Sequence, residues 1–190
     1  MKKEGLGFLF KKIRSVLKEN NIPHLVIGGI ASGVIGKPRF TEVVDLLIFV
    51  SKAKIKILLK SLAAAGLAFD KKEAENTILA RGVFRVFMGK YHADFVISAI
   101  EAGRRALKRA IEIELWGEKV KFPSPEDLIL FKLIAGRELD LIDAKEVFSR
   151  NRKRIDGKYL IASAQQICDE IEDMSVWKRL QKLLKEKDEK

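Results

Sequence analysis

The sequence predicts an α/β (α+β) fold, in which a β-sheet is flanked by helices and followed by a helical C-terminal part. Short apolar strands alternate with segments of helical period in the first 123 residues. Two alternating runs around Gly89-Lys90 indicate a hairpin. Helical patterns dominate from Ser124 onward, so we expect a sheet domain over residues 1–123 and a helical region over 124–190 packed on it.

The first 66 residues contain five predicted elements. Apolar residues at helical spacing begin near residue 6, and Pro23 ends that pattern. An apolar run leads into Gly28-Gly29, a nearly continuous apolar run follows Thr41, and Gly66 closes a lysine-striped helix. The predicted elements are a helix over 4–20, a strand over 24–27, a short helix over about 30–35, a strand over 43–50 and a helix over 52–65.

The rest of the chain begins with two hairpins and ends in helices. Trp116-Gly117 marks the turn of the second hairpin, and Ser124-Pro125 followed by two acids is a strong helix start. A further helix boundary is expected near Asp156-Gly157. The predicted strands are 83–88, 91–98, 111–115 and 118–122, with a short helix near 100–109.

Composition limits the class of protein. The 190 residues (21.5 kDa) are 47% hydrophobic and 33% charged, as in a globular domain with a sizeable core. No apolar run reaches the ~18 residues of a membrane span, and no secretory signal is evident. The single cysteine, Cys168, excludes a disulfide framework and a multi-cysteine zinc site. We therefore expect a cytoplasmic protein with no membrane partner.

Positive charge is concentrated at the N-terminal end. The chain has 37 Lys and Arg against 26 Asp and Glu, a net charge of +11, and residues 1–60 hold 12 against 4, or +8. A basic third of this kind favours a polyanionic partner such as a nucleotide or RNA. The alternative is a solubility charge on the lysine-rich chain of a thermophile, because the sequence has only four Asn and three Gln.

A strand that ends in Gly28-Gly29 and enters a helix is the first candidate site. Glycine lets the backbone approach a ligand closely, and a helix N-terminus offers free N–H groups to phosphate. The alternative is a tight turn that needs glycine for steric reasons alone. A dinucleotide-binding fingerprint is disfavoured, because the glycine spacing is wrong and Asp45, the acid that would bind ribose, falls inside a strand.

Two aspartates fall within predicted strands. Alternation over 41–49 places Asp45 among apolar neighbours, and a buried carboxylate is costly unless it is paired or binds a metal. Asp94 lies on the polar face of its strand. If the two converge, they form a hard-oxygen site for Mg²⁺, the cation that neutralises a triphosphate during nucleotidyl transfer. The alternative is that each aspartate pairs with Arg39 or Lys132.

The segment 124–143 places one lysine within an apolar run and a polar triplet after it. Lys132 either reaches solvent or seeks a buried anion. Arg137, Asp140 and Asp143 recur every three residues and therefore lie near one another on a helix. They form either a structural ion-pair network or a surface that positions a helix against a nucleotide site.

These residues together resemble the nucleotidyltransferase superfamily, and most closely its minimal nucleotidyltransferase-like proteins related to the AbiEii toxins. The resemblance spans roughly residues 24–145. It rests on four pieces in the family's order: Gly28-Gly29, a segment from Arg39 to Ile48 like the family's Arg-x-Thr-x-Asp-x-Asp, the run Ala93-Asp94-Phe95-Val96, and a segment from Pro125 to Asp143.

The resemblance implies a mixed β-sheet flanked by helices, with Mg²⁺ as cofactor and a nucleoside triphosphate as ligand. The implied reaction is in-line attack of an acceptor hydroxyl, on RNA, a protein or a small molecule, at the α-phosphate with release of pyrophosphate. The implied catalytic residues, which are also the implied Mg²⁺ ligands, are Asp45 and Asp94. The implied nucleotide-binding residues are Gly28, Gly29, Arg39, Thr41 and Lys132.

One position departs from the family pattern, because Val43 stands where the family has the first aspartate of its Asp-x-Asp pair. Glu42 cannot replace it, since it points to the opposite face of the strand. Loss of a carboxylate weakens divalent-cation binding, and ~1.4 kcal/mol at the transition state is already tenfold in rate. Two functions stay open: a Mg²⁺-dependent nucleotidyltransferase, or a catalytically inactive protein of that fold that binds nucleotide or RNA, for example as a toxin–antitoxin component.

Overall fold

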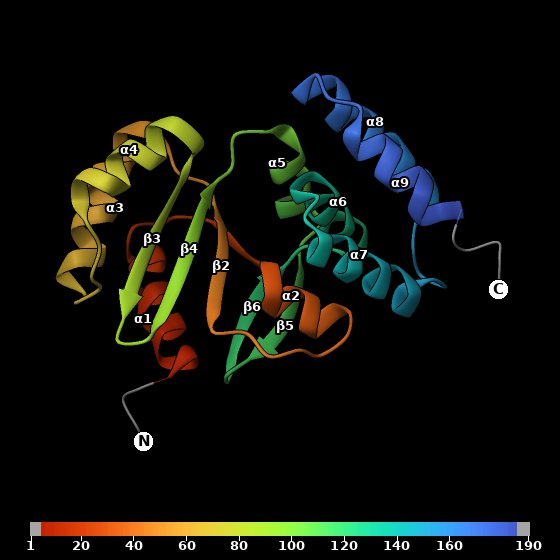
Figure 1. The fold of residues 1–190 in the computed structure, drawn as a ribbon. Coiled ribbons are helices and arrows are strands. Elements are labelled where there is room, and N and C mark those ends of the chain that lie inside the picture. Colours follow the sequence, from red (N-terminus) through yellow and green to blue (C-terminus); the bar gives the residue numbers. More distant parts are fainter. Residues whose placement is uncertain (1–4, 186–190) are drawn as a thin grey trace.

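The computed structural model describes residues 5–185 (Figure 1). Within this range the strands are β1 (His24–Ile27), β2 (Val43–Ile48), β3 (Val83–Met88), β4 (Tyr91–Ile97), β5 (Ile111–Leu115) and β6 (Glu118–Phe122). The helices are α1 (Leu6–Glu19), α2 (Gly28–Ile35), α3 (Lys52–Ala64), α4 (Lys71–Arg81), α5 (Glu101–Lys108), α6 (Pro125–Ala135), α7 (Glu138–Asn151), α8 (Gly157–Ile171) and α9 (Ser175–Lys185).

The first four strands form a mixed sheet in the order β1-β2-β4-β3. β2 and β4 are parallel, whereas β1 pairs with β2 and β3 pairs with β4 in the antiparallel sense. β5 and β6 form a separate hairpin, and β6 contacts β1. This arrangement confirms the predicted fold class and both predicted hairpins.

Helices cover the sheet and flank its edges. One face of β2, made of Val44, Leu46 and Ile48, is fully buried, and α1 packs against β2 and β4 with its apolar side. Figure 1 shows α3 and α4 on the side of β3, and α2, α6 and α7 on the side of β2, with α8 and α9 farthest out. The opposite face of β2 carries Val43 and Asp45, so one charged side chain lies on that face of the strand.

The C-terminal helices are fixed by capping and by a polar cluster. Ser124 caps α6 by accepting a bond from the backbone N–H of Asp127 at 3.2 Å, and the chain leaves the helix through Gly136. Tyr159 of α8 donates its hydroxyl to Asp127 at 2.6 Å, and the guanidinium of Arg109 lies over the Tyr159 ring. The hydrophobic core runs from α1 to α9, and the division at residue 123 remains a prediction.

Three details differ from the sequence-based expectations. The helix expected from about residue 30 begins at Gly28, so both glycines belong to its first turn. The strand expected over 43–50 ends at Ile48. Helix α4 was not predicted, because only Ala74 of its residues is buried and no apolar period marks it. None of the helices between residues 5 and 185 is long and apolar enough to cross a membrane.

Candidate active site

Four side chains from four strands lie in one row across the sheet. The register pairs Ile27 of β1 with Asp45 of β2, Asp45 with Asp94 of β4, and Asp94 with Arg85 of β3. Side chains in register on adjacent strands point to the same face. The structure therefore brings the two predicted aspartates together as direct neighbours, although 48 residues of chain separate them.

Gly28 makes the approach of Asp45 possible. Gly28 adopts the left-handed conformation with φ 64°, and a Cβ at this position would overlap the carboxylate of Asp45. The backbone N–H of Gly29 faces Asp45 Oδ2 at 3.4 Å, so the carboxylate lies against the N-terminus of α2. A negative group is favoured there by the free N–H groups and the helix dipole.

The surroundings of Asp45 disfavour the ionised form of its carboxylate. Burial is the largest cause that raises the pKa of Asp45, and the neighbouring Asp94 raises it further. The Gly29 N–H, Lys132 and Arg137 act in the opposite direction without offsetting the burial. Among residues 5–185 no ion-pair partner of Asp45 is found, so its charge is the least compensated in the row.

Asp94 is held by Arg85. The guanidinium of Arg85 donates from Nε to Oδ1 at 2.5 Å and from Nη2 to Oδ2 at 2.7 Å. This bond to Asp94 raises the pKa of Arg85 above its usual value. The alternative in which each aspartate pairs with Arg39 or Lys132 is wrong, because Arg85 lies directly opposite Asp94 in the hairpin and forms its ion pair.

Lys132 and Arg39 pair with the acids of α7 instead. Lys132 is buried, and its Nζ donates to Asp140 at 2.9 Å and to Asp143 at 2.7 Å. Arg39 reaches Asp143 at 3.2 Å, and Arg137 reaches Asp140 at 2.6 Å. The polar triplet of α7 is therefore an ion-pair network, and it includes both of the expected phosphate-binding cations.

Gly29 lies in the first turn of α2, and Thr41 lies close to it. A Cβ at Gly29 would crowd the Arg39 guanidinium and the Thr41 hydroxyl, so glycine lets both pack against the turn. Thr41 Oγ1 also accepts a bond from the backbone N–H of Val43 at 3.2 Å. The nucleotide-binding roles of these residues remain predictions.

Val43 occupies the next row of the same face, beside His92 of β4 and Phe87 of β3. The structure thus places a partly buried aliphatic group where a third carboxylate would face the site. Among the described residues no group of three or more His, Cys, Asp or Glu is placed to hold a metal ion. Mg²⁺ is commonly held by one or two carboxylates together with substrate phosphates, so Asp45 and Asp94 still fit this cation by chemistry and position.

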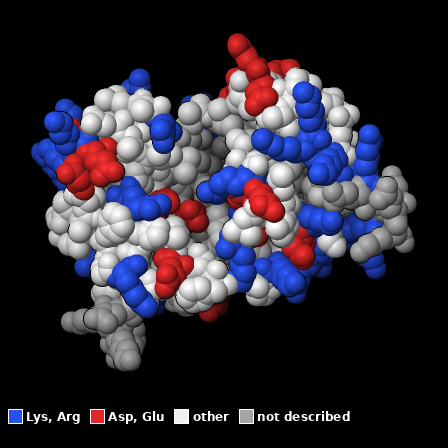
Figure 2. Space-filling model, in the orientation of Figure 1, with Lys and Arg blue, Asp and Glu red and all other residues white. Residues whose placement is uncertain are grey.

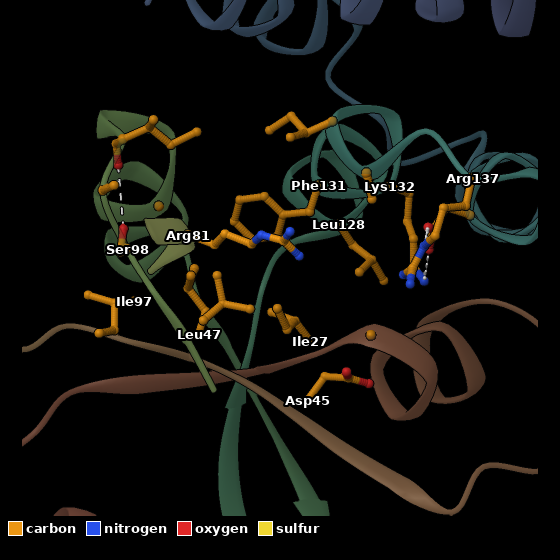
Figure 3. A pocket seen from close by; sticks show the side chains of 18 residues that line it. Ile27, Asp45, Leu47, Arg81, Ile97, Ser98, Leu128, Phe131, Lys132 and Arg137 are labelled. Carbon is orange, nitrogen blue, oxygen red and sulfur yellow. Dashed lines mark hydrogen bonds and ion pairs between the residues drawn. The ribbon is translucent and has the colours of Figure 1, made fainter. Parts of the chain in front are cut away.

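Two pockets meet at Asp45. The first has a volume of about 390 Å³ and lies between the sheet and α6, with Gly28 and Lys132 in its wall. In Figure 3 Leu128 and Phe131 approach it from α6, while Ile27 and Leu47 approach from the sheet. The second has a volume of about 450 Å³ and lies toward α4 and the β3–β4 hairpin. Three residues line both pockets: Asp45, Val96 and Arg137.

The two pockets form one cleft that is open to solvent. Figure 2 shows a hollow between the part of the molecule with α3 and α4 and the part with α6–α9, and both acidic and basic side chains line its rim. A mainly apolar pocket with a few charged groups at one end is the usual form of a small-molecule site. The cleft can therefore hold an organic anion near the N-terminus of α2.

Sequence reasoning missed three residues of the cleft. Arg85 could have been found by counting from the Gly89-Lys90 turn, which places it opposite Asp94. Arg81 and Phe131 line the first pocket, but nothing in the sequence distinguishes them from an ordinary surface arginine and an ordinary core phenylalanine.

No family model matches the sequence, and no curated protein matches it. Solved structures do resemble the fold. The antibiotic-resistance factor ANT(2'')-Ia in solution matches with a TM-score of 0.58 and 16% identity, over 87% of this chain and 94% of that one. An antigenic nucleotidyltransferase-like protein from Paracoccidioides brasiliensis matches with a TM-score of 0.54 and 16% identity, over 95% of this chain and 88% of that one.

A crystal structure of ANT(2'')-Ia in complex with adenylyl-2''-tobramycin also matches, with a TM-score of 0.52 and 18% identity, over 75% of this chain and 87% of that one. The relation to AbiEii toxins, the toxin–antitoxin context and the thermophilic source remain predictions. Similarity at these identities shows the fold alone. Together with the mixed sheet and its helical C-terminal region, it shows that this chain has a nucleotidyltransferase-like fold.

Proposed function

We propose that the protein is a Mg²⁺-dependent nucleotidyltransferase that moves a nucleotide from a nucleoside triphosphate to an acceptor hydroxyl and releases pyrophosphate. One observation carries the proposal: Asp45 and Asp94 are neighbours in register, beside the glycine-led N-terminus of α2, where two pockets meet. Two adjacent carboxylates next to a helix N-terminus provide both a cation site and a place for phosphate.

The roles follow from the positions of the side chains. The N-terminal turn of α2, which begins with Gly28 and Gly29, would bind phosphate oxygens beside Asp45, and Arg39 and Lys132 would place positive charge behind it. Thr41, packed against the same turn, would contact the phosphates there. These three side chains would thus bind and orient the triphosphate, while the apolar pocket under α6 excludes water from the nucleoside.

Asp45, with Asp94 beside it, would hold the Mg²⁺ ion. When bound, Mg²⁺ supplies positive charge that stabilises the α-phosphate and the pyrophosphate leaving group. Asp94 faces the second pocket, from which an acceptor would enter, and its carboxylate would accept the proton of the attacking hydroxyl. Arg85 keeps that carboxylate in a fixed orientation.

A second candidate function is nucleotide or RNA binding without catalysis. Val43 favours it, because an aliphatic side chain removes one carboxylate from the face that would hold the cation. In this case the cleft would bind a nucleoside triphosphate and leave it intact.

The test uses α-labelled nucleoside triphosphates with Mg²⁺ and three kinds of acceptor: RNA, protein, and an aminoglycoside, since one structural neighbour was solved with an adenylylated aminoglycoside. Label transfer by the wild type that is lost in Asp45→Asn supports the transferase. Glu42→Gln is the matched control, because it removes an exposed carboxylate from the bend just before β2. It is expected to transfer label as the wild type does.

The two candidates separate in Val43→Asp. If the wild type binds nucleotide without transferring it, and Val43→Asp transfers it, the binding function is supported. If the wild type binds no nucleoside triphosphate at millimolar concentration with Mg²⁺ present, both candidates are wrong.

A further inference from the structure

Both carboxylate oxygens of Asp94 already face a cation that belongs to the chain. Arg85 stands opposite Asp94 in the β3–β4 register and donates two parallel N–H bonds, at 2.5 and 2.7 Å. A planar guanidinium that bonds a carboxylate through two atoms is the strong and directional form of this interaction. The strands hold both side chains on one face, so the pair forms without ordering a loop.

We infer that Arg85 takes the place of a second divalent cation, so that this cleft binds a single Mg²⁺ ion, held chiefly by Asp45. The inference rests on the proposed function, because it concerns the cation of that same site. Arg85 lies half-exposed on an edge strand, a position that by itself suggests no role in the site. In this inference its positive charge neutralises Asp94 and so sets the number of metal ions that the cleft can bind.

The balance of charge in the row supports one cation. Asp45 and Asp94 are the only carboxylates that β2 and β4 carry, since Val43 fills the third position. Two-metal sites place the ions about 3.5–4 Å apart and need enough carboxylates to separate them. Two carboxylates, one guanidinium and one divalent cation have the same net charge as three carboxylates and two divalent cations. The loss of an acid and the gain of an arginine therefore compensate for the loss of one cation.

The difference between the two aspartates supports the same assignment. Asp45 is half-buried, and within residues 5–185 its carboxylate meets only the Gly29 N–H, at 3.4 Å, so it has free lone pairs for a cation. Asp94 already has a cation in Arg85. A first divalent cation is thus drawn to Asp45, and a second would have to displace the guanidinium.

The experiment counts bound Mn²⁺, which replaces Mg²⁺ and whose free form gives a quantifiable EPR signal. The wild type, Arg85→Gln, Asp94→Asn and the double variant Arg85→Gln/Asp94→Asn are titrated without nucleotide, after their melting temperatures confirm folding. Arg81→Gln is the matched control, because Arg81 carries the same charge in the same cleft but lines the other pocket. Catalytic turnover is not needed for this readout.

We expect the wild type and Arg81→Gln to bind one Mn²⁺ per chain. Arg85→Gln is expected to bind a second ion, or the first about tenfold more tightly, because groups that bond to metal-binding carboxylates tune affinity by this order. The double variant is expected to return to wild-type binding, since the gain requires a free Asp94. A pair with a purely structural role would change the melting temperature and leave these isotherms unchanged.

Three results would overturn the inference: two Mn²⁺ ions on the wild type, identical isotherms for the wild type and Arg85→Gln, or no Mn²⁺ binding by either. Label transfer measured on the same preparations separates this inference from the proposed function. If the isotherms behave as expected and no variant transfers label, the transferase fails while the single-cation site stands. If the wild type transfers label and Arg85→Gln binds Mn²⁺ as the wild type does, only the role of Arg85 fails.

Discussion

Gly28→Ala is the substitution whose effect the structure specifies most closely. Gly28 has a φ of 64°, and a Cβ there would overlap three atoms of the Asp45 side chain. Gly89, in the turn of the β3–β4 hairpin, has a φ of 59°, and a Cβ there would meet nothing within 4 Å. The two positions share a positive φ and differ in the overlap, so Gly89→Ala is a control for the cost of the backbone conformation.

The magnitude has two parts. Alanine in the left-handed region costs roughly 1 kcal/mol relative to glycine, and both variants lose this amount. Forcing an extra methyl group into a packed position costs about 1–3 kcal/mol more, which applies to Gly28→Ala alone. We therefore expect losses of about 1 kcal/mol for Gly89→Ala and about 2–4 kcal/mol for Gly28→Ala.

Urea unfolding of the wild type and both variants measures these losses. The midpoint should shift while the slope with denaturant stays constant, because neither variant changes the surface exposed on unfolding. Gly28→Ala should also weaken binding of a nucleoside triphosphate with Mg²⁺, since Asp45 must move. If Gly28→Ala is no less stable than Gly89→Ala, Asp45 does not lie against the first turn of α2, and the reasoning about the site is wrong.

Three further predictions concern buried charges. Burial raises the pKa of Asp45 above its ordinary value of 3.8, so the ionised carboxylate lowers the free energy of unfolding as the pH rises through the folded-state pKa. Asp45→Asn should therefore be more stable than the wild type at pH 7. Urea unfolding should show that this advantage vanishes below pH 3.8. Lys132→Met should lose about 3 kcal/mol of stability in the same assay, because two buried acids lose their shared cation. Arg137→Gln removes an exposed guanidinium and should lose less than about 1 kcal/mol. Equal losses in the two variants would contradict the buried network. Tyr159→Phe should lose about 1–3 kcal/mol, because Asp127 loses a hydrogen bond in a buried place, and an unchanged melting temperature would argue against that bond.

Local patterns predicted most of the elements, and they also hold one contact of the site that was missed. The turn at Gly89-Lys90 fixes the register of its hairpin, and that register alone places Arg85 opposite Asp94. The Ser124 cap begins α6 as expected from residue type, whereas the end of α6 at Gly136 was not predicted. These features depend on neighbours a few residues away, so the sequence carries them directly. Helix α4 escaped prediction because its exposed, mostly polar residues carry no period.

The partners of the charged residues could not be predicted in the same way. From the sequence alone, several acids could have paired with Lys132. The contact between helices α6 and α7 selects Asp140 and Asp143. Burial then makes that choice strong, because a lysine removed from water requires a carboxylate close by. Arg39 pairs with Asp143 of α7, and not with an aspartate of the sheet as in the alternative to its predicted nucleotide-binding role.

The amino-acid sequence by itself determined the strands, the glycine turn, the hairpin pair of Arg85 and Asp94, and the absence of an acid at residue 43. Only the tertiary structure decided that Asp45 lies next to Asp94 and that α6 closes a pocket above them. The physical reason is range: turns, caps and alternation are set by contacts within a few residues, whereas parallel pairing of β2 with β4 joins segments far apart in the chain and is selected by the packing of the whole core.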